Sequence, residues 1–270
     1  MNDEHRSRRL VERYERDGDE DSRLSRSKSH RTEFLTTDFV LKRYVQPGSS
    51  ILDIGAGTGR YSLHYAQLGH KVVARDLVDY NIGILRSNPL CTELGIDAGV
   101  GDARDLSEFP DDAFDVVLCH GPLYHIGEAD GRQRCIAECL RVLKAGGVLS
   151  VAYISKFYVF VEMVRRNRKF LSDRLRGQIM CNETVLKEDP GNLWFFDSPQ
   201  EIEALFSGFP VDRLAHAGTD GIAILMADVV DSFDEEQYEQ WLKYHYATCE
   251  EPSLLGYSNH LLYACRKRGF

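Results

Sequence analysis

The stretch Ile51-Leu52-Asp53-Ile54-Gly55-Ala56-Gly57-Thr58-Gly59-Arg60-Tyr61 decides how this chain folds. The apolar run that ends at Ile54 is typical of a buried strand, and the three glycines after it are typical of a tight loop before a helix. Because glycine has no Cβ, the backbone can turn sharply here and approach a ligand closely. The stretch therefore predicts a strand–loop–helix unit whose loop binds a ligand.

On both sides of this unit the pattern alternates between strands and helices. We expect strands at 50–54, 71–76, 97–100, 114–119, 148–154, 211–217 and 260–265. We expect helices at 33–44 with Thr32 as its cap, and at 60–68, 80–94, 132–143, 157–175, from 198 onward and at 235–248. Such alternation favours parallel β-α-β crossovers, that is, a doubly wound α/β fold with helices on both faces of the sheet.

The chain divides into four parts by composition. Residues 1–32 form a charged N-terminal arm, which is either a solvated, frayed helix or a lid over a ligand. Residues 33–154 carry the regular alternation and form the ligand-binding core. Residues 155–197 form a cap insertion, and residues 198–270 complete the core with a second insertion at about 219–257.

Charge and cysteine content limit the function classes. The 270 residues have a net charge of −9, which disfavours nucleic acid as the main substrate. The seven cysteines form no C-x-x-C pair, and the helical pair Cys135 and Cys139 lacks further ligands, so we expect buried thiols and no metal. The chain has no apolar signal segment and no run approaching the ~20 residues of a membrane span. These features predict a cytoplasmic protein.

The acids at the strand ends help to distinguish two cofactor types. Asp76 ends the second predicted strand, where a carboxylate can accept hydrogen bonds from both hydroxyls of a ribose. A dinucleotide loop has the spacing G-x-G-x-x-G, but this chain has G-x-G-x-G, with Asp53 just before it. Asp53 would repel a pyrophosphate, yet it could orient the loop or bind an amino group. The charges therefore favour S-adenosylmethionine, which is cationic and has no phosphate, over a nicotinamide dinucleotide.

Five segments occur in the order of a known motif series: ILDIGAGTGRYS, VVARDL, GDARDL, FDVVLCHGPLYHI and RVLKAGGVLSV. This series resembles that of class I S-adenosylmethionine-dependent methyltransferases, most closely the small-molecule branch that includes the ubiquinone-biosynthesis type. The resemblance covers residues 33–154. It implies a Rossmann-like sheet of seven strands with the last strand antiparallel, and helical insertions that cap the site.

The resemblance also implies a role for each residue of the cofactor site. Gly55, Ala56 and Gly57 would line the methionine part, Asp76 would hold the ribose and Leu77 would pack on the adenine. Asp102 would accept a hydrogen bond from the adenine amino group, the Ala103 amide would donate to the ring, and Cys119 and His120 would offer backbone carbonyls to the methionine ammonium.

Candidate bases follow the fourth predicted strand. His120, Tyr124 and His125 lie there, and histidine titrates near neutral pH. The alternative is that Tyr124 and His125 only pack beneath the cofactor. His260, at the start of the last strand, has the character of a structural residue.

The run His120-Gly121-Pro122-Leu123-Tyr124 departs from the Asn/Asp-Pro-Pro-aromatic run of many methyltransferases that act on adenine or glutamine. We therefore expect methyl transfer to an oxygen or nitrogen atom of a small molecule. The alternatives are a tRNA or protein methyltransferase, a nicotinamide-dependent oxidoreductase and a non-catalytic module that binds the cofactor. The oligomeric state is left open.

Overall fold

The computed structural model describes residues 3–17, 21–172, 176–177, 179 and 193–269. Its centre is one seven-stranded sheet with the order β3-β2-β1-β4-β5-β7-β6. Strand β7 runs antiparallel to both of its neighbours, whereas the pairs among β1 to β5 are parallel. This confirms the predicted sheet. The strands are β1 Ser50–Ile54, β2 Lys71–Asp76, β3 Asp97–Val100, β4 Phe114–Cys119, β5 Leu143–Ile154, β6 Val211–Gly218 and β7 His260–Lys267.

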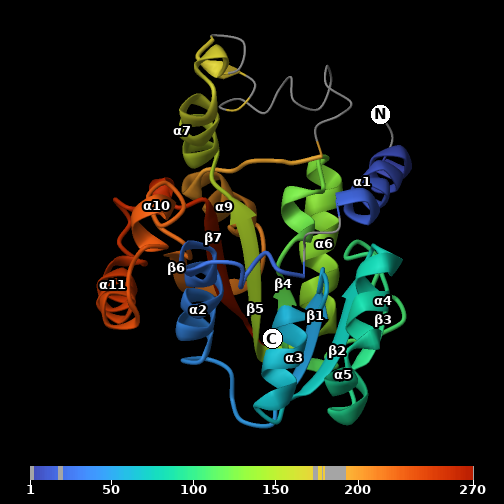
Figure 1. Cartoon of the computed structure of the whole chain (residues 1–270). Coiled ribbons are helices and arrows are strands. Elements are labelled where there is room, and N and C mark those ends of the chain that lie inside the picture. Colours follow the sequence, from blue (N-terminus) through green and yellow to red (C-terminus); the bar gives the residue numbers. More distant parts are fainter. Residues whose placement is uncertain (1–2, 18–20, 173–175, 178, 180–192, 270) are drawn as a thin grey trace.

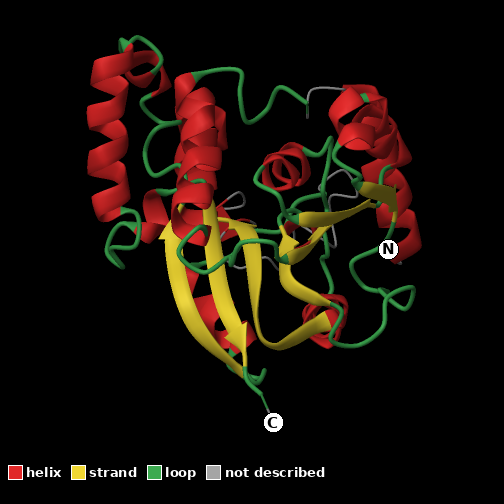
Figure 2. Cartoon of the chain, turned by 90° about the horizontal axis from the view of Figure 1, so that it is seen from below, coloured by secondary structure: helices red, strands yellow, loops and turns green. Residues whose placement is uncertain are grey.

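Helices cover both faces of the sheet (Figures 1 and 2). On one face, apolar side chains of α2, α3, α4 and α5 pack on the strands, and on the other face those of α6 and α9 do so. Successive residues of β1 point to opposite faces of the sheet: Ile51 packs with the helices α2 to α5, and Leu52 packs with α6 and α9. The helices are α1 Asp3–Asp17, α2 Lys28–Leu41, α3 Arg60–Gln67, α4 Asp79–Ser87, α5 Pro89–Glu93, α6 Ala129–Val142, α7 Lys156–Arg166, α9 Pro199–Phe206, α10 Ala227–Val230 and α11 Glu235–Thr248.

Several helix boundaries differ from the prediction: α2 ends at Leu41 where 44 was expected, and α6 begins at Ala129 where 132 was expected. Two further differences have a local cause. Helix α2 begins at Lys28, so Thr32 lies inside it, and its hydroxyl donates a hydrogen bond to the Lys28 carbonyl in place of capping the helix. The predicted helix 80–94 is broken in two because Asn88 accepts a hydrogen bond from Leu90 N and Pro89 starts a new helix.

Larger differences concern β5 and the segment that follows it. Strand β5 begins at Leu143, whereas the prediction started it at Val148. Gly146 has φ +78°, so the glycines form a bulge within the strand. Helix α7 ends at Arg166, where Asn167 takes an extended conformation. The α-helix predicted over 157–175 therefore does not continue through residues 167–172, where only Arg168–Phe170 form a short 3-10 helix. Residues 173–175 lie outside the described part.

The carboxyl ends of the parallel strands meet at one edge of the sheet, which lies at the top of Figure 1. Because β7 is antiparallel, its first residue reaches the same edge: His260 pairs with Ile154, the last residue of β5. In sheets of this kind ligands bind along this edge. No helix among the described ranges has both the length and the apolar composition needed to cross a bilayer.

A buried ion pair anchors the segment that leads into α9. Arg132 of α6 donates two hydrogen bonds to Asp197, at 3.1 and 2.7 Å, and both side chains are 6% exposed. The Arg132 guanidinium also lies 4.4 Å from the ring centre of Phe195. Residues 193–197 are thereby fixed against α6, and they lie next to the cavity described below.

Candidate cofactor site

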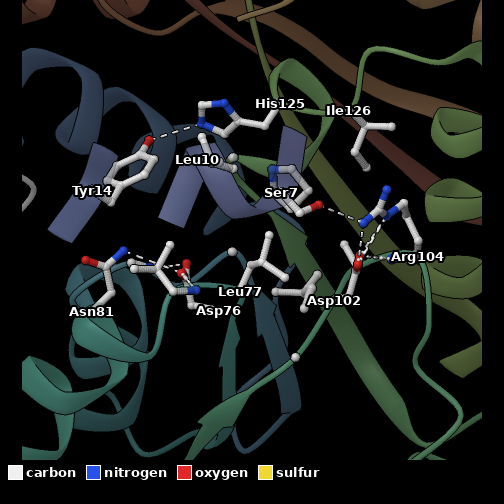
Figure 3. Close-up of a pocket in the computed structure, with 18 of the residues that line it drawn as sticks. Ser7, Leu10, Tyr14, Asp76, Leu77, Asn81, Asp102, Arg104, His125 and Ile126 are labelled. Atoms are coloured by element: carbon white, nitrogen blue, oxygen red, sulfur yellow. Dashed lines mark hydrogen bonds and ion pairs between the residues drawn. The ribbon is translucent and has the colours of Figure 1, made fainter. Parts of the chain in front are cut away.

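A cavity of about 800 Å³, including its open mouth, lies at the carboxyl edge of the sheet (Figure 3). The loops after β1, β2, β3 and β4 form its floor, and helix α1 forms one wall. Its lining residues are Arg6, Ser7, Leu10, Tyr14, Ile54, Gly55, Gly57, Asp76, Leu77, Val78, Asn81, Gly101, Asp102, Ala103, Arg104, His120, Gly121, Pro122, Tyr124, His125 and Ile126.

The glycine loop requires glycine at two positions. Gly55 has φ +83°, and a Cβ added there would lie 2.5 Å from Cδ of Pro122. Gly59 has φ +90°, and a Cβ there would collide with the side chain of Leu85. Residues other than glycine rarely adopt this region and would also clash. The loop after β1 therefore packs tightly against the loop after β4 and leaves backbone facing the cavity.

Asp76 is positioned by backbone amides. Its two carboxylate oxygens accept hydrogen bonds from Gly57 N and Val78 N, each at 2.8 Å, and the Asn81 amide lies 3.4 Å away. The side chain lines the cavity although the residue is only 8% exposed. The end of β2 thus presents a fixed carboxylate next to the glycine loop.

Asp102, after β3, is paired with Arg104. The Arg104 guanidinium donates to both carboxylate oxygens of Asp102, the shortest distance being 2.6 Å, and also to Ser7 Oγ of α1 at 3.2 Å. Burial raises the pKa of Asp102, but hydrogen bonds from Arg104 lower it by more. The carboxylate therefore stays ionised, and Arg104 connects the β3 loop to α1.

His125 joins the β4 loop to two other segments. Its Nδ1 donates to the Leu193 carbonyl at 3.0 Å, which leaves Nε2 to accept from the Tyr14 hydroxyl at 3.0 Å, as Figure 3 shows. Arg6 of α1 donates to its backbone carbonyl at 2.8 Å. Burial lowers the pKa of His125 to about 4. A neutral ring with both nitrogens engaged is suited to positioning α1 and less suited to removing a proton.

His120 also stays neutral. Its Nε2 lies 2.8 Å from Ser150 Oγ, and its ring meets the edge of Tyr61. Burial, with the positive charge of Arg23, lowers the pKa of His120 to about 3. Such a histidine is a weak base at neutral pH, so the geometry favours a packing role beside the cavity.

The structure brings together nine of the twelve site residues expected from the sequence. They are Gly55, Gly57, Asp76, Leu77, Asp102, Ala103, His120, Tyr124 and His125. Ala56 and Cys119 do not line the cavity. The Cys119 side chain instead lies in the apolar core, 3.8 Å from Cys135 Sγ.

Asp53 lies beneath the loop and does not line the cavity either. One of its oxygens accepts a hydrogen bond from Ser62 Oγ at 2.6 Å. The other oxygen, Oδ1, is buried without a partner in the described part of the chain. Burial raises the pKa of Asp53 to about 7, although the Ser62 hydrogen bond acts in the opposite direction.

The sequence left open whether residues 1–32 cover a ligand, and it did not predict that Arg104 lines this cavity. Leu10 and Tyr14 lie four residues apart and so share one face of a helix, which was the available signal. In the structure that face lies on the cavity, and Leu10 is 8% exposed. Helix α1 therefore packs over the cavity.

Residues 52–151 match the family model described as "Methyltransferase domain". The chain is 31% identical over 119 residues to "Ubiquinone biosynthesis O-methyltransferase" of Xanthomonas campestris pv. campestris (strain B100), covering 44% of this chain and 48% of the relative. It is 37% identical over 132 residues to "Demethylmenaquinone methyltransferase" of Renibacterium salmoninarum, covering 49% and 51%. The chain thus spans about half the length of these curated relatives.

A solved structure extends the likeness to most of the chain. The structure of a SAM-dependent methyltransferase from Methanosarcina mazei aligns with a TM-score of 0.56 and 20% identity. The alignment covers 85% of this chain and 97% of that one. At this identity the likeness establishes the fold, and the reaction must be argued from the site.

Proposed function

We propose that this chain, whose residues 52–151 match a methyltransferase domain and whose sheet has the order expected for the class I fold, transfers the methyl group of S-adenosylmethionine to a small molecule. The observation that carries this proposal is the cavity at the carboxyl edge of the sheet. There, the glycine loop and the amide-held carboxylate of Asp76 lie side by side.

The residues present suit an adenosyl sulfonium ligand. Asp76 would hold the ribose hydroxyls, and Leu77, Asp102 and Ala103 would contact the adenine. The backbone at Gly55 and Gly57 would face the methionine part, since a Cβ at Gly55 would clash with Pro122. Asp76 supplies negative charge beside the loop, which fits a cationic ligand and opposes a pyrophosphate.

Methyl transfer from a sulfonium requires the protein mainly to hold the two reactants in the right positions. When bound, S-adenosylmethionine supplies an activated methyl group, and the protein aligns an acceptor with it and removes a proton where the acceptor needs it. Helix α1 would shield the reacting groups from water, because it covers the cavity and is tied to His125 and Arg104. We therefore interpret α1 as a lid.

The lid predicts faster ligand release when a contact is removed. Tyr14→Phe deletes the hydroxyl that donates to His125, a hydrogen bond worth about 0.5–1.5 kcal/mol. S-adenosylhomocysteine should then dissociate about 3–10-fold faster, as measured by stopped-flow fluorescence. Tyr80→Phe, at an exposed position on α4, is the matched control and should leave the rate unchanged. An unchanged rate in Tyr14→Phe would refute the role of this contact.

The function itself is tested by calorimetry and by label transfer. S-adenosylmethionine should bind with higher affinity than NAD, and label from its methyl group should appear in a metabolite fraction below about 1 kDa. Preferential binding of NAD would favour an oxidoreductase. Label in tRNA or protein alone would favour a macromolecular substrate. Binding without transfer to any fraction would indicate a non-catalytic module.

A further inference from the structure

A second cavity, of about 770 Å³ including its open mouth, lies at the same edge of the sheet. Its walls come from the start of α2 and the turn before it, from α7, and from the start of β7. The six lining residues that matter here are Arg23, Glu33, Tyr158, Glu162, Arg166 and His260.

This second cavity is adjacent to the cofactor site. It opens over β5 and β7, whereas the cofactor site lies over β2, β1 and β4, and β4 pairs directly with β5. Ring contacts link the two cavities. Glu33 lines the second cavity, its chain neighbour Phe34 packs on Tyr61 with ring centres 5.3 Å apart, and Tyr61 packs on His120 of the first cavity at 4.9 Å. A molecule in the second cavity would therefore lie at the same edge of the sheet as the cofactor site, over the neighbouring strands.

His260 is held in one orientation by a buried carboxylate. Asp220, 1% exposed, accepts hydrogen bonds on Oδ1 from Ser258 Oγ and from the backbone amides of Asn259 and His260. Its Oδ2 accepts from His260 Nδ1 at 2.9 Å. In the described part of the chain Nε2 has no hydrogen-bond partner. The ring therefore presents an unoccupied nitrogen at the cavity it lines.

The same three groups, Glu33, Asp220 and His260, lie close enough to suggest a cation site, but their hydrogen bonds argue against it. Both oxygens of Asp220 already accept from donors, and Glu33 accepts from Arg23 and lies 3.1 Å from His260 Nδ1. A metal would have to displace a proton and several amide donors. The cluster is better described as a carboxylate–histidine dyad.

Tyr158 adds an independent sign of a ligand. Tyr158 is 3% exposed and lines the cavity. Its hydroxyl has no hydrogen-bond partner among the described residues. Buried hydroxyls nearly always have a partner. An oxygen atom of a bound molecule would supply one at this place.

We propose, building on the function proposed above, that this cavity binds the methyl acceptor, a hydroxyl compound, and that His260 removes its proton. The hydroxyl loses its proton to Nε2, its oxygen bonds to the methyl carbon, and the carbon–sulfur bond breaks with its electron pair staying on sulfur. Asp220 is the positioning residue. Three guanidinium groups, those of Arg23, Arg26 and Arg166, and two carboxylates, those of Glu33 and Glu162, line this cavity. The excess of positive charge disfavours a cationic amine as the acceptor.

The charges around His260 give the expected pH dependence. Burial and Arg23 lower the pKa of His260, but the carboxylates of Glu33 and Asp220 raise it by more, so it lies above its usual value. Glu162 and Arg166 of α7 face the same cavity as an ion pair. Because the neutral ring accepts the proton, transfer should rise with pH through this pKa. Asp220→Asn removes one carboxylate, so the rise should move to lower pH.

The test measures label transfer and cofactor binding on the same variants. His260→Ala should slow transfer at least 100-fold, the usual scale for a general base, while S-adenosylmethionine affinity stays within 2-fold. Tyr158→Phe removes an oxygen that bonds to nothing in the protein, so stability should hold while KM for the acceptor rises about 5-fold or more. Tyr244→Phe, at an exposed position, is the matched control and should behave as wild type. The labelled product should be an O-methyl compound.

The outcomes separate this inference from the proposed function. Absence of S-adenosylmethionine binding in the wild type would refute the function. Normal binding with transfer by His260→Ala within 5-fold of wild type, or an N-methyl product, would overturn only the inference.

If wild type transfers no label, a binding probe decides. With S-adenosylhomocysteine present, 3,4-dihydroxybenzoate should shift the His260 ring-proton NMR signal, whereas benzylamine should not. Binding should be at least 5-fold weaker in Tyr158→Phe. An unmoved His260 signal would refute the assignment of this cavity.

Discussion

Replacing Asp76 with alanine should weaken S-adenosylmethionine binding about 100-fold in calorimetry. The carboxylate is fixed at the cavity by Gly57 N and Val78 N, and it would accept hydrogen bonds from both ribose hydroxyls. Hydrogen bonds to a charged group are worth about 1.5–3 kcal/mol each, and about 2.8 kcal/mol corresponds to 100-fold in affinity. Loss of the Gly57 contact also loosens the glycine loop, which adds to the effect.

Two further variants separate ribose binding from general damage. Asp79→Ala changes a nearby exposed carboxylate and should alter affinity less than 2-fold. Asp76→Asn keeps an oxygen acceptor, so its loss should be smaller than that of Asp76→Ala. If folded Asp76→Ala binds S-adenosylmethionine as wild type does, the ribose assignment is wrong.

The parts of the site that the sequence predicted are those set by local geometry. Gly55 and Gly59 need positive φ, and the acids Asp76 and Asp102 follow strands whose apolar runs are visible in the sequence. Parallel strands bring such ends to one edge without any knowledge of side-chain packing. The sheet and the loop positions followed from these rules and from the motif resemblance.

The parts that the sequence did not predict depend on contacts between distant segments. His260 had the character of a structural residue because its sequence neighbours give no sign of Asp220, which reaches it only when β6 and β7 pair. The sequence alone makes His125 a candidate base, but the structure places Tyr14 and Leu193 on its two ring nitrogens. The hydrophobic periodicity of a sequence does not show which distant residues form hydrogen bonds. The partners of His125 and His260 are therefore visible only in the structure.

The buried pair of Arg132 and Asp197 carries the largest expected effect on stability. Arg132→Met leaves the Asp197 carboxylate buried at 6% exposure without its guanidinium partner. Breaking such a pair from one side costs about 3–5 kcal/mol. Urea unfolding should show a loss of that size in the free energy of unfolding. Since Leu193 accepts from His125 and Phe195 N donates to Tyr124 O at 2.7 Å, the cavity wall should loosen as well.

The double variant Arg132→Met/Asp197→Leu tests the physical cause. Replacing both partners with apolar side chains removes the uncompensated charge, so the free energy of unfolding should return to within about 1–2 kcal/mol of wild type. Arg268→Met breaks a surface pair with Asp212, whose side chains are 57% and 62% exposed, and should leave the free energy of unfolding nearly unchanged. If the double variant is no more stable than Arg132→Met, the loss comes from packing around residues 193–197, and the buried charge is not its source.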